Sequence, residues 1–371
     1  MKVASFNLEN MFDRAKAMNN ATWTEGKPAL EAHRELNTLI NQAVYDEATQ
    51  QRILDLLDEQ EILTKDEGPL LRIRKIRGKF VKRARNGTVT VEAAGRNDWI
   101  GWVELVTEAV EERATENTAR VIATVNPDIL GVIEAEDRTT LRLFNNAVMP
   151  AVQGAPYDHA MLIDGNDERG IDVGLLTRAP YAIMSIRTNV DAVDALGVIF
   201  SRDCAEYEIA MPDGTPLWVL VNHLKSKGYG RQRDNDARRL RQAQRVRELV
   251  DAHLAAGHER IVVLGDLNDK PDADTLAPLL GNGTPLHDVA TLATGYDDGG
   301  RPGTHGNCTA ASKFDYILLS SALFARATAA GIERRGMWGG TRGTLWPHFP
   351  EVMEAKDAAS DHAAVWVELD V

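Results

Sequence analysis

Residues 262–269 read VVLGDLND, and this stretch holds the main clue to the fold. Three apolar residues and a glycine form a run typical of a buried strand, and the run ends in an acid and an amide. Asp266 and Asn268 lie two positions apart, so in an extended chain both side chains project to the same side. A carboxylate there can accept a proton from water while the neighbouring amide donates to a developing negative charge. The stretch therefore predicts a buried strand whose end carries catalytic groups.

The same arrangement recurs where other apolar runs begin or end. Polar residues follow VASF, ILGVI and WVLV, and they precede YILLS and AAVWV. Charged side chains beside such runs are costly to desolvate unless they are paired or bind a metal ion. Several with the same placement indicate one shared cleft, because α/β folds build their sites from loops at strand ends. The residues concerned are Asn7, Glu9, Glu134, Glu136, Asn222, His223, Asp315, Asp361 and His362.

The residue types in this set favour one kind of chemistry. Carboxylate and amide oxygens without cysteine suit Mg²⁺, Mn²⁺ or Ca²⁺ better than zinc. Histidine beside carboxylates gives pairs in which the acid fixes the tautomer and stabilises the imidazolium. The sequence contains no glycine-rich nucleotide-binding fingerprint and no serine nucleophile elbow, and Cys204 and Cys308 make neither a disulfide framework nor a zinc site. The set indicates metal-assisted attack of water on a phosphate ester.

Composition limits the class of protein. The chain has 371 residues, of which 44% are hydrophobic and 26% charged, as is typical of a globular protein. No apolar run approaches the ~18–20 residues of a membrane span. Because the N-terminus lacks the apolar core of a signal peptide, we expect a soluble, cytoplasmic chain, although a secreted one after signal removal would look the same. The net charge of −13 argues against a surface that is basic all over, but it allows a local basic patch and fits carboxylates gathered around a cation.

Apolar periodicity predicts strands that alternate with a few helices, which indicates an α/β protein with mixed sheets. The predicted helices lie within 29–63, 102–125 and 233–257. The predicted strands are 2–8, 128–136, 171–178, 204–210, 216–226, 261–269, 313–321 and 362–370.

Residues 71–85, LRIRKIRGKFVKRAR, form a distinct basic segment with eight Lys or Arg and no acid. Asn86–Gly87 follows between two β-like runs, which predicts a two-stranded ribbon over 78–94. Two interpretations of the segment stay open: a charged strand protected against edge pairing, and a surface that grips a phosphate backbone. Trp99 and Trp102, just beyond it, are expected to be core anchors.

Eight short motifs in order resemble the endonuclease/exonuclease/phosphatase superfamily, the DNase I-like metal-dependent hydrolases. They are SFNLENMF (5–12), NPDILGVIEAE (126–136), RGIDVGLLTR (169–178), FSR (200–202), VNHLKSK (221–227), VVLGDLND (262–269), FDYILLS (314–320) and SDHAAV (360–365). They cover nearly the whole chain apart from roughly residues 14–100. GDLND or SDH alone is a weak signal, and the full ordered set is a specific one. The resemblance implies a four-layer α/β sandwich, two packed mixed β-sheets flanked by helices, as a single domain over 1–371 with an insertion at 14–100 that holds helices and a basic hairpin.

The resemblance also implies roles for individual residues. Glu134 matches the principal metal-binding glutamate, Asp361 a second acid on the metal side, and Glu9 a further ligand. The expected ion is Mg²⁺, with Mn²⁺ or Ca²⁺ as alternatives. Asp266 matches the residue that positions and deprotonates the attacking water, and Asn268 matches its partner that stabilises the oxyanion.

Further matches concern the groups around the phosphate. Asn7 matches the asparagine that orients the metal-binding glutamate and the phosphate. His362 matches the histidine on the phosphate, with Asp315 paired to it. His223 matches the second histidine of the DNase I-like branch, and Asp172 is its expected carboxylate partner.

Two more residues are expected to bind substrate. Arg202 matches an arginine of the DNase I-like branch near the phosphate, and Asn222 precedes the second histidine. By contrast, His305 has no motif around it, and we expect it to be structural or on the surface.

These expectations describe a Mg²⁺- or Mn²⁺-dependent phosphodiesterase, a nuclease that cleaves DNA or RNA by in-line attack of water without a covalent intermediate. Its partner is then a nucleic acid, gripped by the basic segment 71–85. The alternative is a phosphatase or phosphodiesterase acting on small or lipid-linked phosphate esters, which the acidic net charge favours. A third class, a binding protein with a dead site, fits poorly because the polar set is nearly complete.

Overall fold

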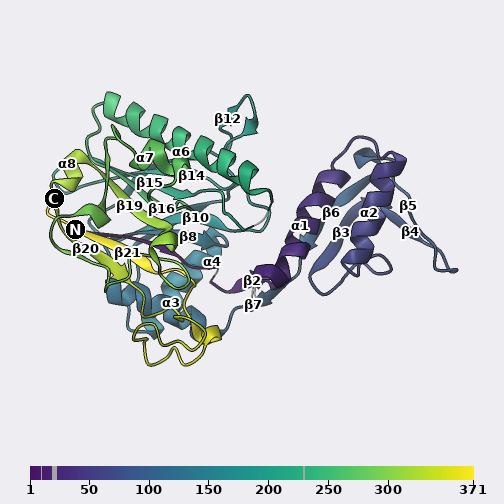
Figure 1. The fold of residues 1–371 in the computed structure, drawn as a ribbon, viewed down its shortest axis with the longest axis horizontal. Coiled ribbons are helices and arrows are strands. Elements are labelled where there is room, and N and C mark those ends of the chain that lie inside the picture. Colours follow the sequence, from purple (N-terminus) through teal and green to yellow (C-terminus); the bar gives the residue numbers. More distant parts are fainter. Residues whose placement is uncertain (10, 19–22, 229) are drawn as a thin grey trace. The chain divides into compact units, whose positions relative to one another are not determined.

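The computed structural model describes residues 1–9, 11–18, 23–228 and 230–371. They form two compact units (Figure 1). Unit 1 comprises Met1–Phe12, Val110–Lys227 and Arg231–Val371, and unit 2 comprises Asp13–Ala109 with Gly228–Gly230. Among the described residues, none of the helices combines the length and the apolar sequence that a bilayer crossing requires.

Unit 1 contains two large mixed sheets, and the first has seven strands. Their spatial order is β18 (Tyr296–Asp297), β20 (Ala327–Glu333), β21 (Ala364–Leu369), β1 (Lys2–Asn7), β8 (Ile129–Ala135), β10 (Asp172–Thr177) and β9 (His159–Ile163). β1 pairs in parallel with β8 and antiparallel with β21, so the first strand of the chain lies inside this sheet.

The second sheet of unit 1 has six strands. Their spatial order is β11 (Ile183–Arg187), β14 (Cys204–Ile209), β15 (Leu217–His223), β16 (Ile261–Asp266), β19 (Asp315–Ser320) and β17 (Leu286–Asp288). The quoted stretch VVLGD thus forms β16, which runs parallel to β15 and antiparallel to β19. A short hairpin of β12 (Val193–Asp194) and β13 (Gly197–Val198) stands apart from both sheets.

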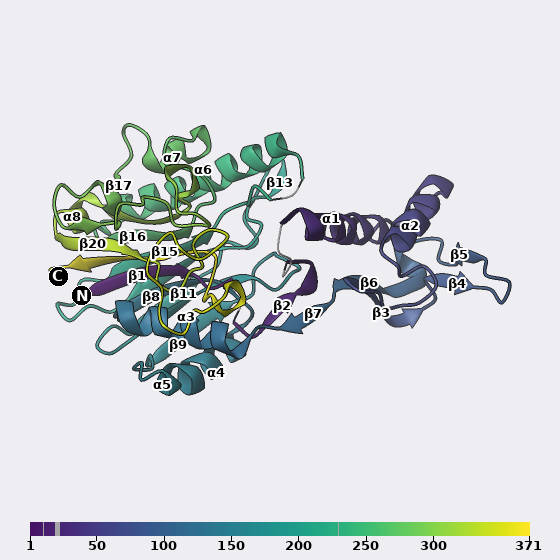
Figure 2. The same cartoon turned by 60° about the horizontal axis from the view of Figure 1, so that its bottom comes forward.

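The two sheets pack face to face, and helices cover their outer faces (Figures 1 and 2). The inner core joins Val3 and Ile133 of the first sheet to Val219 and Ile317 of the second. The outer face of the first sheet is covered by α3 (Glu112–Val125), α4 (Arg138–Leu143) and α5 (Met149–Ala151). The outer face of the second sheet is covered by α6 (Gln232–Ala255) and α7 (Ala277–Leu280), and the short α8 (Ser321–Phe324) follows β19.

This arrangement confirms the predicted four-layer α/β sandwich. Strands buried on both faces need side chains that are apolar in both directions, which explains why β8 and β16 read as continuous apolar runs instead of alternating ones. The helix predicted over 233–257 is α6.

The helix predicted over 102–125 is wrong in its first half. The structure places β6 at Trp99–Leu105 and β7 at Thr107–Ala109, and α3 begins only at Glu112. In β6 the buried residues alternate with more exposed ones, and this period of two indicates a strand. The helix prediction did not take this alternation into account. The single helical region predicted over 29–63 consists of two helices, α1 (Trp23–Ile40) and α2 (Glu47–Glu59). Asp46 caps the start of α2 by accepting from the Thr49 N–H at 2.8 Å.

Unit 2 is built from these two helices and three strand pairs. β3 (Leu71–Gly78) pairs with β6, β4 (Val81–Arg83) with β5 (Val89–Val91), and β2 (Asp13–Ala15) with β7, all antiparallel. Its core is made of its own residues, among them Leu36, Ile53, Leu57, Leu71, Trp99 and Val103. Asn86–Gly87 lies in the turn between β4 and β5, where Gly87 has φ +87°, a conformation that favours glycine. The basic segment 71–85 therefore spans β3 and β4.

Candidate active site

The last residues of β15 and β16 and the first residue of β19 lie at the same level of the second sheet, and each has a polar side chain. His223 of β15 lies opposite Asp266 of β16, and Asp266 lies opposite Asp315 of β19. Gly265, just before Asp266, has φ +130°, and a Cβ there would lie 1.9 Å from the Asn222 carbonyl oxygen. Only glycine fits this close approach, so the sequence LGD is what allows β15 and β16 to pair beside the site.

The first sheet contributes Asn7 from the end of β1 and Glu134 from β8. Asp172 pairs with Ala135 and Val173 pairs with Ile133, so Glu134 is left out of the ladder as a β-bulge. Glu134 has φ 62°, a left-handed conformation that is uncommon outside glycine. Glu9 and Asn268, at φ 51° and 56°, share this conformation. Such strained backbone is concentrated at functional sites.

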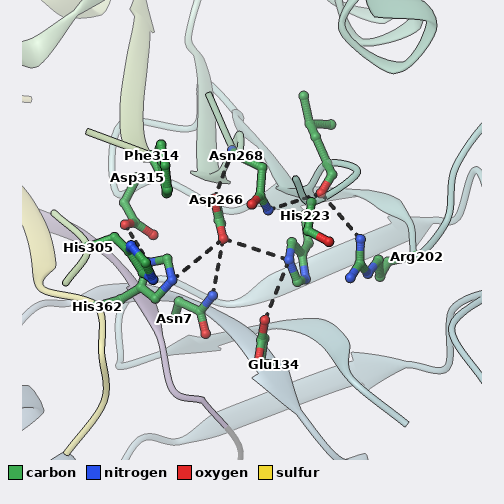
Figure 3. A network of polar contacts seen from close by, with 12 residues as sticks. Asn7, Glu134, Arg202, His223, Asp266, Asn268, His305, Phe314, Asp315 and His362 are labelled. Atoms are coloured by element: carbon green, nitrogen blue, oxygen red, sulfur yellow. Dashed lines mark hydrogen bonds and ion pairs between the residues drawn. The ribbon is translucent and has the colours of Figure 1, made fainter. Parts of the chain in front are cut away.

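The Asp266 carboxyl group lies at the centre of these side chains (Figure 3). Its Oδ1 accepts a hydrogen bond from the Asn268 N–H at 2.8 Å, which fixes the orientation of the group. Its Oδ2 lies 3.3 Å from Asn7 Nδ2, 3.7 Å from His223 Nε2 and 3.9 Å from His362 Nε2. One oxygen is thus anchored to backbone, and the other faces an amide and two imidazoles drawn from both sheets.

The two histidines have opposite electrostatic surroundings. His362 Nδ1 lies 2.7 Å from Asp315 Oδ2. Burial opposes the charge on His362, but the carboxylates of Asp315 and Asp361 outweigh it and raise its pKa well above the usual value. Burial, and next the positive charge of Arg202, hold the pKa of His223 well below the usual value. The site therefore offers one imidazolium and one neutral imidazole.

Burial, and next the negative charge of Asp315, raise the pKa of Asp266 to about 7. A carboxyl group that titrates near neutral pH is a stronger base than an ordinary aspartate. The neighbouring Glu134 Oε1 lies 3.6 Å from His223 Nε2, so Glu134, His223, Asp266 and His362 form a continuous chain of contacts.

The Endonuclease/Exonuclease/phosphatase family model matches residues 111–362. The chain belongs to this family. Membership confirms the resemblance drawn from the ordered motifs, and it implies a phosphoester hydrolase.

Among solved structures, an endonuclease/exonuclease/phosphatase family protein from Bacteroides thetaiotaomicron is similar in fold, with a TM-score of 0.50, 18% identity, and coverage of 69% of this chain and 86% of that chain. The mannosyl-6-phosphatase Bt3783 from the same species has 18% identity, coverage of 70% and 92%, and a TM-score of 0.49. Truncated TDP2 from Caenorhabditis elegans has 17% identity, coverage of 68% and 89%, and a TM-score of 0.46. No curated protein matched the sequence.

Members of the endonuclease/exonuclease/phosphatase family generally use a divalent metal ion, and the donors present here fit one. Asp266, Asp315 and His362 offer ligand atoms within 4.8 Å of one another, and so do His305, Asp361 and His362. Both groups include His362, which would bind a cation only after losing its proton. Asp315 Oδ1 is buried without a hydrogen-bond partner among the described residues, which leaves a lone pair for a cation. Carboxylates with histidine suit a hard divalent cation.

The expected ligands Glu9 and Asp361 lie side by side at the rim of the site. Glu9 Oε2 accepts from the Asp361 N–H at 2.9 Å. The third expected ligand, Glu134, lies on the other side of Asp266, next to His223.

His305 is the site residue that the sequence analysis missed. Its Nε2 lies 3.2 Å from Asp361 Oδ2, and its ring lies 4.7 Å from the ring of His362 and 5.3 Å from that of Phe314. An isolated bridge pairs His305 with His362 and holds the turn 303–309 beside the SDH motif. Nothing in the local sequence signals this contact, because it depends on a loop folding against a strand that begins far along the chain.

The predicted pairing of Asp172 with His223 is wrong. Asp172 Oδ1 instead accepts from the Gly165 N–H at 2.8 Å, so this carboxyl group lies against the loop before β10. His223 Nδ1 is buried and has no hydrogen-bond partner among the described residues. Burial raises the pKa of Asp172 to about 7.

The other side chains predicted to contact the substrate form hydrogen bonds or ion pairs within the protein instead. Arg202 is buried, with Nε 2.8 Å from Asp167 Oδ2 and Nη1 3.3 Å from the Leu224 carbonyl oxygen (Figure 3). Asn222 Nδ2 donates to the Leu220 carbonyl, and Asn268 Nδ2 to that of Leu224. Arg202 is thus positioned to act on the site through its charge.

Proposed function

We propose that this protein is a divalent-metal-dependent phosphodiesterase, a nuclease that cleaves DNA or RNA by in-line attack of water. The observation that carries the proposal is the surroundings of Asp266 Oδ2, which faces Asn7, His223 and His362 while Oδ1 is fixed by Asn268 N–H. A fixed base next to three nitrogen groups suits proton removal from water beside a negatively charged phosphate.

In the proposed reaction, Asp266 takes a proton from water as the water oxygen forms its bond to phosphorus and the opposite ester bond breaks. The electron pair of that bond leaves on the ester oxygen, which takes a proton from solvent. The imidazolium of His362 and the amide of Asn7 stabilise the charge that develops on the phosphoryl oxygens. Asp315 keeps His362 charged and oriented, as their 2.7 Å contact allows. Neutral His223 holds the other side of the phosphate, where the charge of Arg202 adds to the field.

The residues proposed to hold the metal ion are Glu134, Asp361 and Glu9. When bound, Mg²⁺ or Mn²⁺ would supply Lewis-acid stabilisation of the phosphate and orient it for attack. Asn268 was expected to stabilise the oxyanion, but its Nδ2 donates to the Leu224 carbonyl. The role proposed for it is to fix Asp266 Oδ1 through its backbone N–H.

The proposed substrate is a nucleic acid, supported by the cations of segment 71–85 in an otherwise acidic chain. The second candidate is a small or lipid-linked phosphate ester, and the net charge of −13 favours it, because so acidic a protein repels polyanions overall.

Purified protein incubated with Mg²⁺ or Mn²⁺ distinguishes the two. Plasmid DNA, RNA, bis(p-nitrophenyl) phosphate and p-nitrophenyl phosphate serve as substrates, and EDTA removes the metal in the control. We expect polynucleotide cleavage that EDTA abolishes. Hydrolysis of the small esters without polynucleotide cleavage supports the second candidate, and no metal binding with no hydrolysis of any substrate overturns both.

A further inference from the structure

One face of the β3–β6 sheet in unit 2 is exposed. Buried residues of both strands, including Leu71, Trp99 and Val103, join the core beneath α1 and α2. Because successive side chains in a strand point to opposite faces, Ile100 and Trp102 lie on the other side of β6. They are 36% and 43% exposed. The expectation that Trp102 anchors a core is therefore wrong, whereas Trp99 does so.

The cations of segment 71–85 fall into two groups. Some are paired within unit 2: Arg72 and Arg74 both bind Glu104, Arg83 donates to the carbonyl groups of Ile62, Leu63 and Lys65 and to Asp66, and Lys79 lies 3.5 Å from Glu92. The side chains of the others are exposed and make no hydrogen bond or ion pair with any described residue, and these are Lys75, Arg77, Lys82 and Arg85. Among the paired cations, the side chains of Arg74 and Lys79 are still 47% and 72% exposed, so an outside anion can also reach them.

Strand pairing places the cations of β3 beside the apolar side chains of β6. On the exposed face, Arg74 lies opposite Trp102 and Arg77 opposite Ile100. Lys75 lies opposite Gly101, on the face of Trp99 and Val103. Paired strands lie about 4.7–4.9 Å apart, so the side chains on the exposed face are neighbours. Arg72 and Arg74 share the single carboxylate of Glu104, and Arg77 has no partner among the described residues, so this face keeps a net positive charge beside the indole. The indole can stack on a base while the arginines contact the adjoining phosphates.

We propose that this exposed surface, Arg74, Arg77, Ile100 and Trp102, binds single-stranded nucleic acid. Charge complementarity identifies an anionic partner, since this face has the three arginines Arg72, Arg74 and Arg77 against the single carboxylate of Glu104, in a chain of net charge −13. A single strand fits better than a duplex because its bases offer their flat faces to Trp102, whereas a duplex stacks them against one another. The inference concerns binding by unit 2 and does not depend on the proposed hydrolysis.

An acidic membrane would also attract cations next to a tryptophan. Membrane-binding surfaces insert apolar side chains that protrude, and here the tip of the β4–β5 hairpin reads Arg85, Asn86, Gly87 and Thr88, all without a large apolar group. Trp102 lies in the middle of a strand instead. These positions favour the nucleic acid.

The test measures binding of fluorescein-labelled oligothymidylate to the full chain by fluorescence anisotropy, in EDTA so that no metal-dependent cleavage occurs. Trp102→Ala should weaken binding about tenfold, and Trp102→Phe should retain most of it, because stacking needs an aromatic ring. Arg77→Ala should weaken binding and lower the slope of log affinity against log salt by about 0.7–1, as expected for one lost phosphate contact. Circular dichroism checks that each variant is folded.

Lys27→Ala is the matched control, since Lys27 lies on α1, which packs against the opposite face of the sheet, and its removal should change neither affinity nor salt slope. Wild-type affinity in both Trp102→Ala and Arg77→Ala overturns the proposal. So does duplex binding that equals single-strand binding and does not require Trp102. Capture by phosphatidylserine vesicles that needs Trp102, with no binding of oligothymidylate, overturns it in favour of a membrane.

Discussion

Asp266 illustrates, at the scale of single residues, how burial prepares a carboxyl group for chemistry. Its pKa is raised to about 7 by burial and by Asp315, while one oxygen is fixed by a backbone N–H. Two imidazoles contact the other oxygen, and their environments push their own pKa values apart, upwards for His362 and downwards for His223. Neighbouring titratable groups whose pKa values are shifted in opposite directions mark the acid and base of an active site.

Alanine at Asp266, Glu134 or His362 tests the proposed roles directly. Each change should lower the rate of hydrolysis by at least about 10²–10³-fold, the effect of removing one stabilising group in a hydrolase site. Initial rates on whichever substrate the wild-type protein cleaves give the effect, and thermal unfolding shows whether the variant is folded. A folded variant with wild-type turnover contradicts the role of that residue.

Asp172 gives a prediction about pH, because burial raises the pKa of this carboxyl group from the ordinary 3.8 to about 7. Because the folded state binds this proton more tightly than the unfolded state, the free energy of unfolding falls as pH rises between those two values. The fall is up to about 1.4 kcal/mol per pH unit. Asp172→Asn keeps the acceptor for Gly165 N–H and removes the charge. Its melting temperature should exceed that of the wild type, with a larger gain at about pH 8 than at about pH 5.

The two melting curves at each pH decide this point. An equal gain at both pH values, or a loss at the higher one, would show that Asp172 is not a buried acid with a raised pKa.

At the scale of elements, the site is built from places where regular strands stop being regular. Seven non-glycine residues described in the structure have positive φ, and three of them, Glu9, Glu134 and Asn268, belong to the site. The bulge in β8 turns Glu134 out of the ladder towards His223. The strained backbone at these positions directs side chains into the site, and the packing of the sheets on either side keeps the backbone in that conformation.

Replacing Glu134 by glycine separates strain from function. A non-glycine residue in the left-handed conformation destabilises the folded state by about 1–2 kcal/mol, and glycine removes this strain. Glycine also makes the unfolded chain more flexible, which lowers stability by about 0.5–1 kcal/mol. Glu134→Gly should therefore be at least as stable as the wild type. It should nevertheless lose hydrolysis as Glu134→Ala does. Denaturant unfolding and initial rates measure the two effects.

Glu61→Gly is the matched control, since Glu61 has φ 58° and lies in unit 2. It should show the same change in stability with hydrolysis of a small ester unaffected. Clear destabilisation of both variants would contradict the account of backbone strain.

At the scale of the whole molecule, the long segment Asp13–Ala109 leaves unit 1 and returns to it at one place. The Val110 N–H donates to the Phe12 carbonyl at 2.7 Å, and β2 pairs with β7 immediately beyond. The core of unit 2 contains residues from Ala15 to Leu105 alone. An insertion whose ends lie together can be removed with little change in the path of the remaining chain.

Replacing Asp13–Ala109 by a short glycine–serine linker should therefore leave unit 1 folded, with a cooperative thermal transition. The shortened protein should hydrolyse a small phosphodiester within about tenfold of the full chain, since all the proposed catalytic residues lie in unit 1. It should bind oligothymidylate more weakly. A chain that fails to fold would show that unit 1 needs unit 2 for its stability.

Local patterns in the sequence determined which strands are buried and where each one ends in a polar group. VVLGDLND and SDHAAV showed this without coordinates, because burial on both faces demands a continuous apolar run, and a charged residue marks where the run meets solvent or a site. The order of the motifs then identified the family and the four layers. The prediction was weakest at 102–125, where the period of two in β6 is followed closely by the helical period of α3. The helical period was extended over both segments, so the strand was not recognised.

Only the tertiary structure decided which polar groups meet. Asn7 and Asp266 are 259 residues apart in sequence, and their contact depends on how one sheet packs on the other. The same dependence explains why His305 was missed, why Asp172 turns to Gly165 and not to His223, and why half of the cations of segment 71–85 are paired while Arg77 is free. Side-chain periodicity records the burial of each residue, but a contact between distant residues is set by strand register and packing, which no local pattern contains.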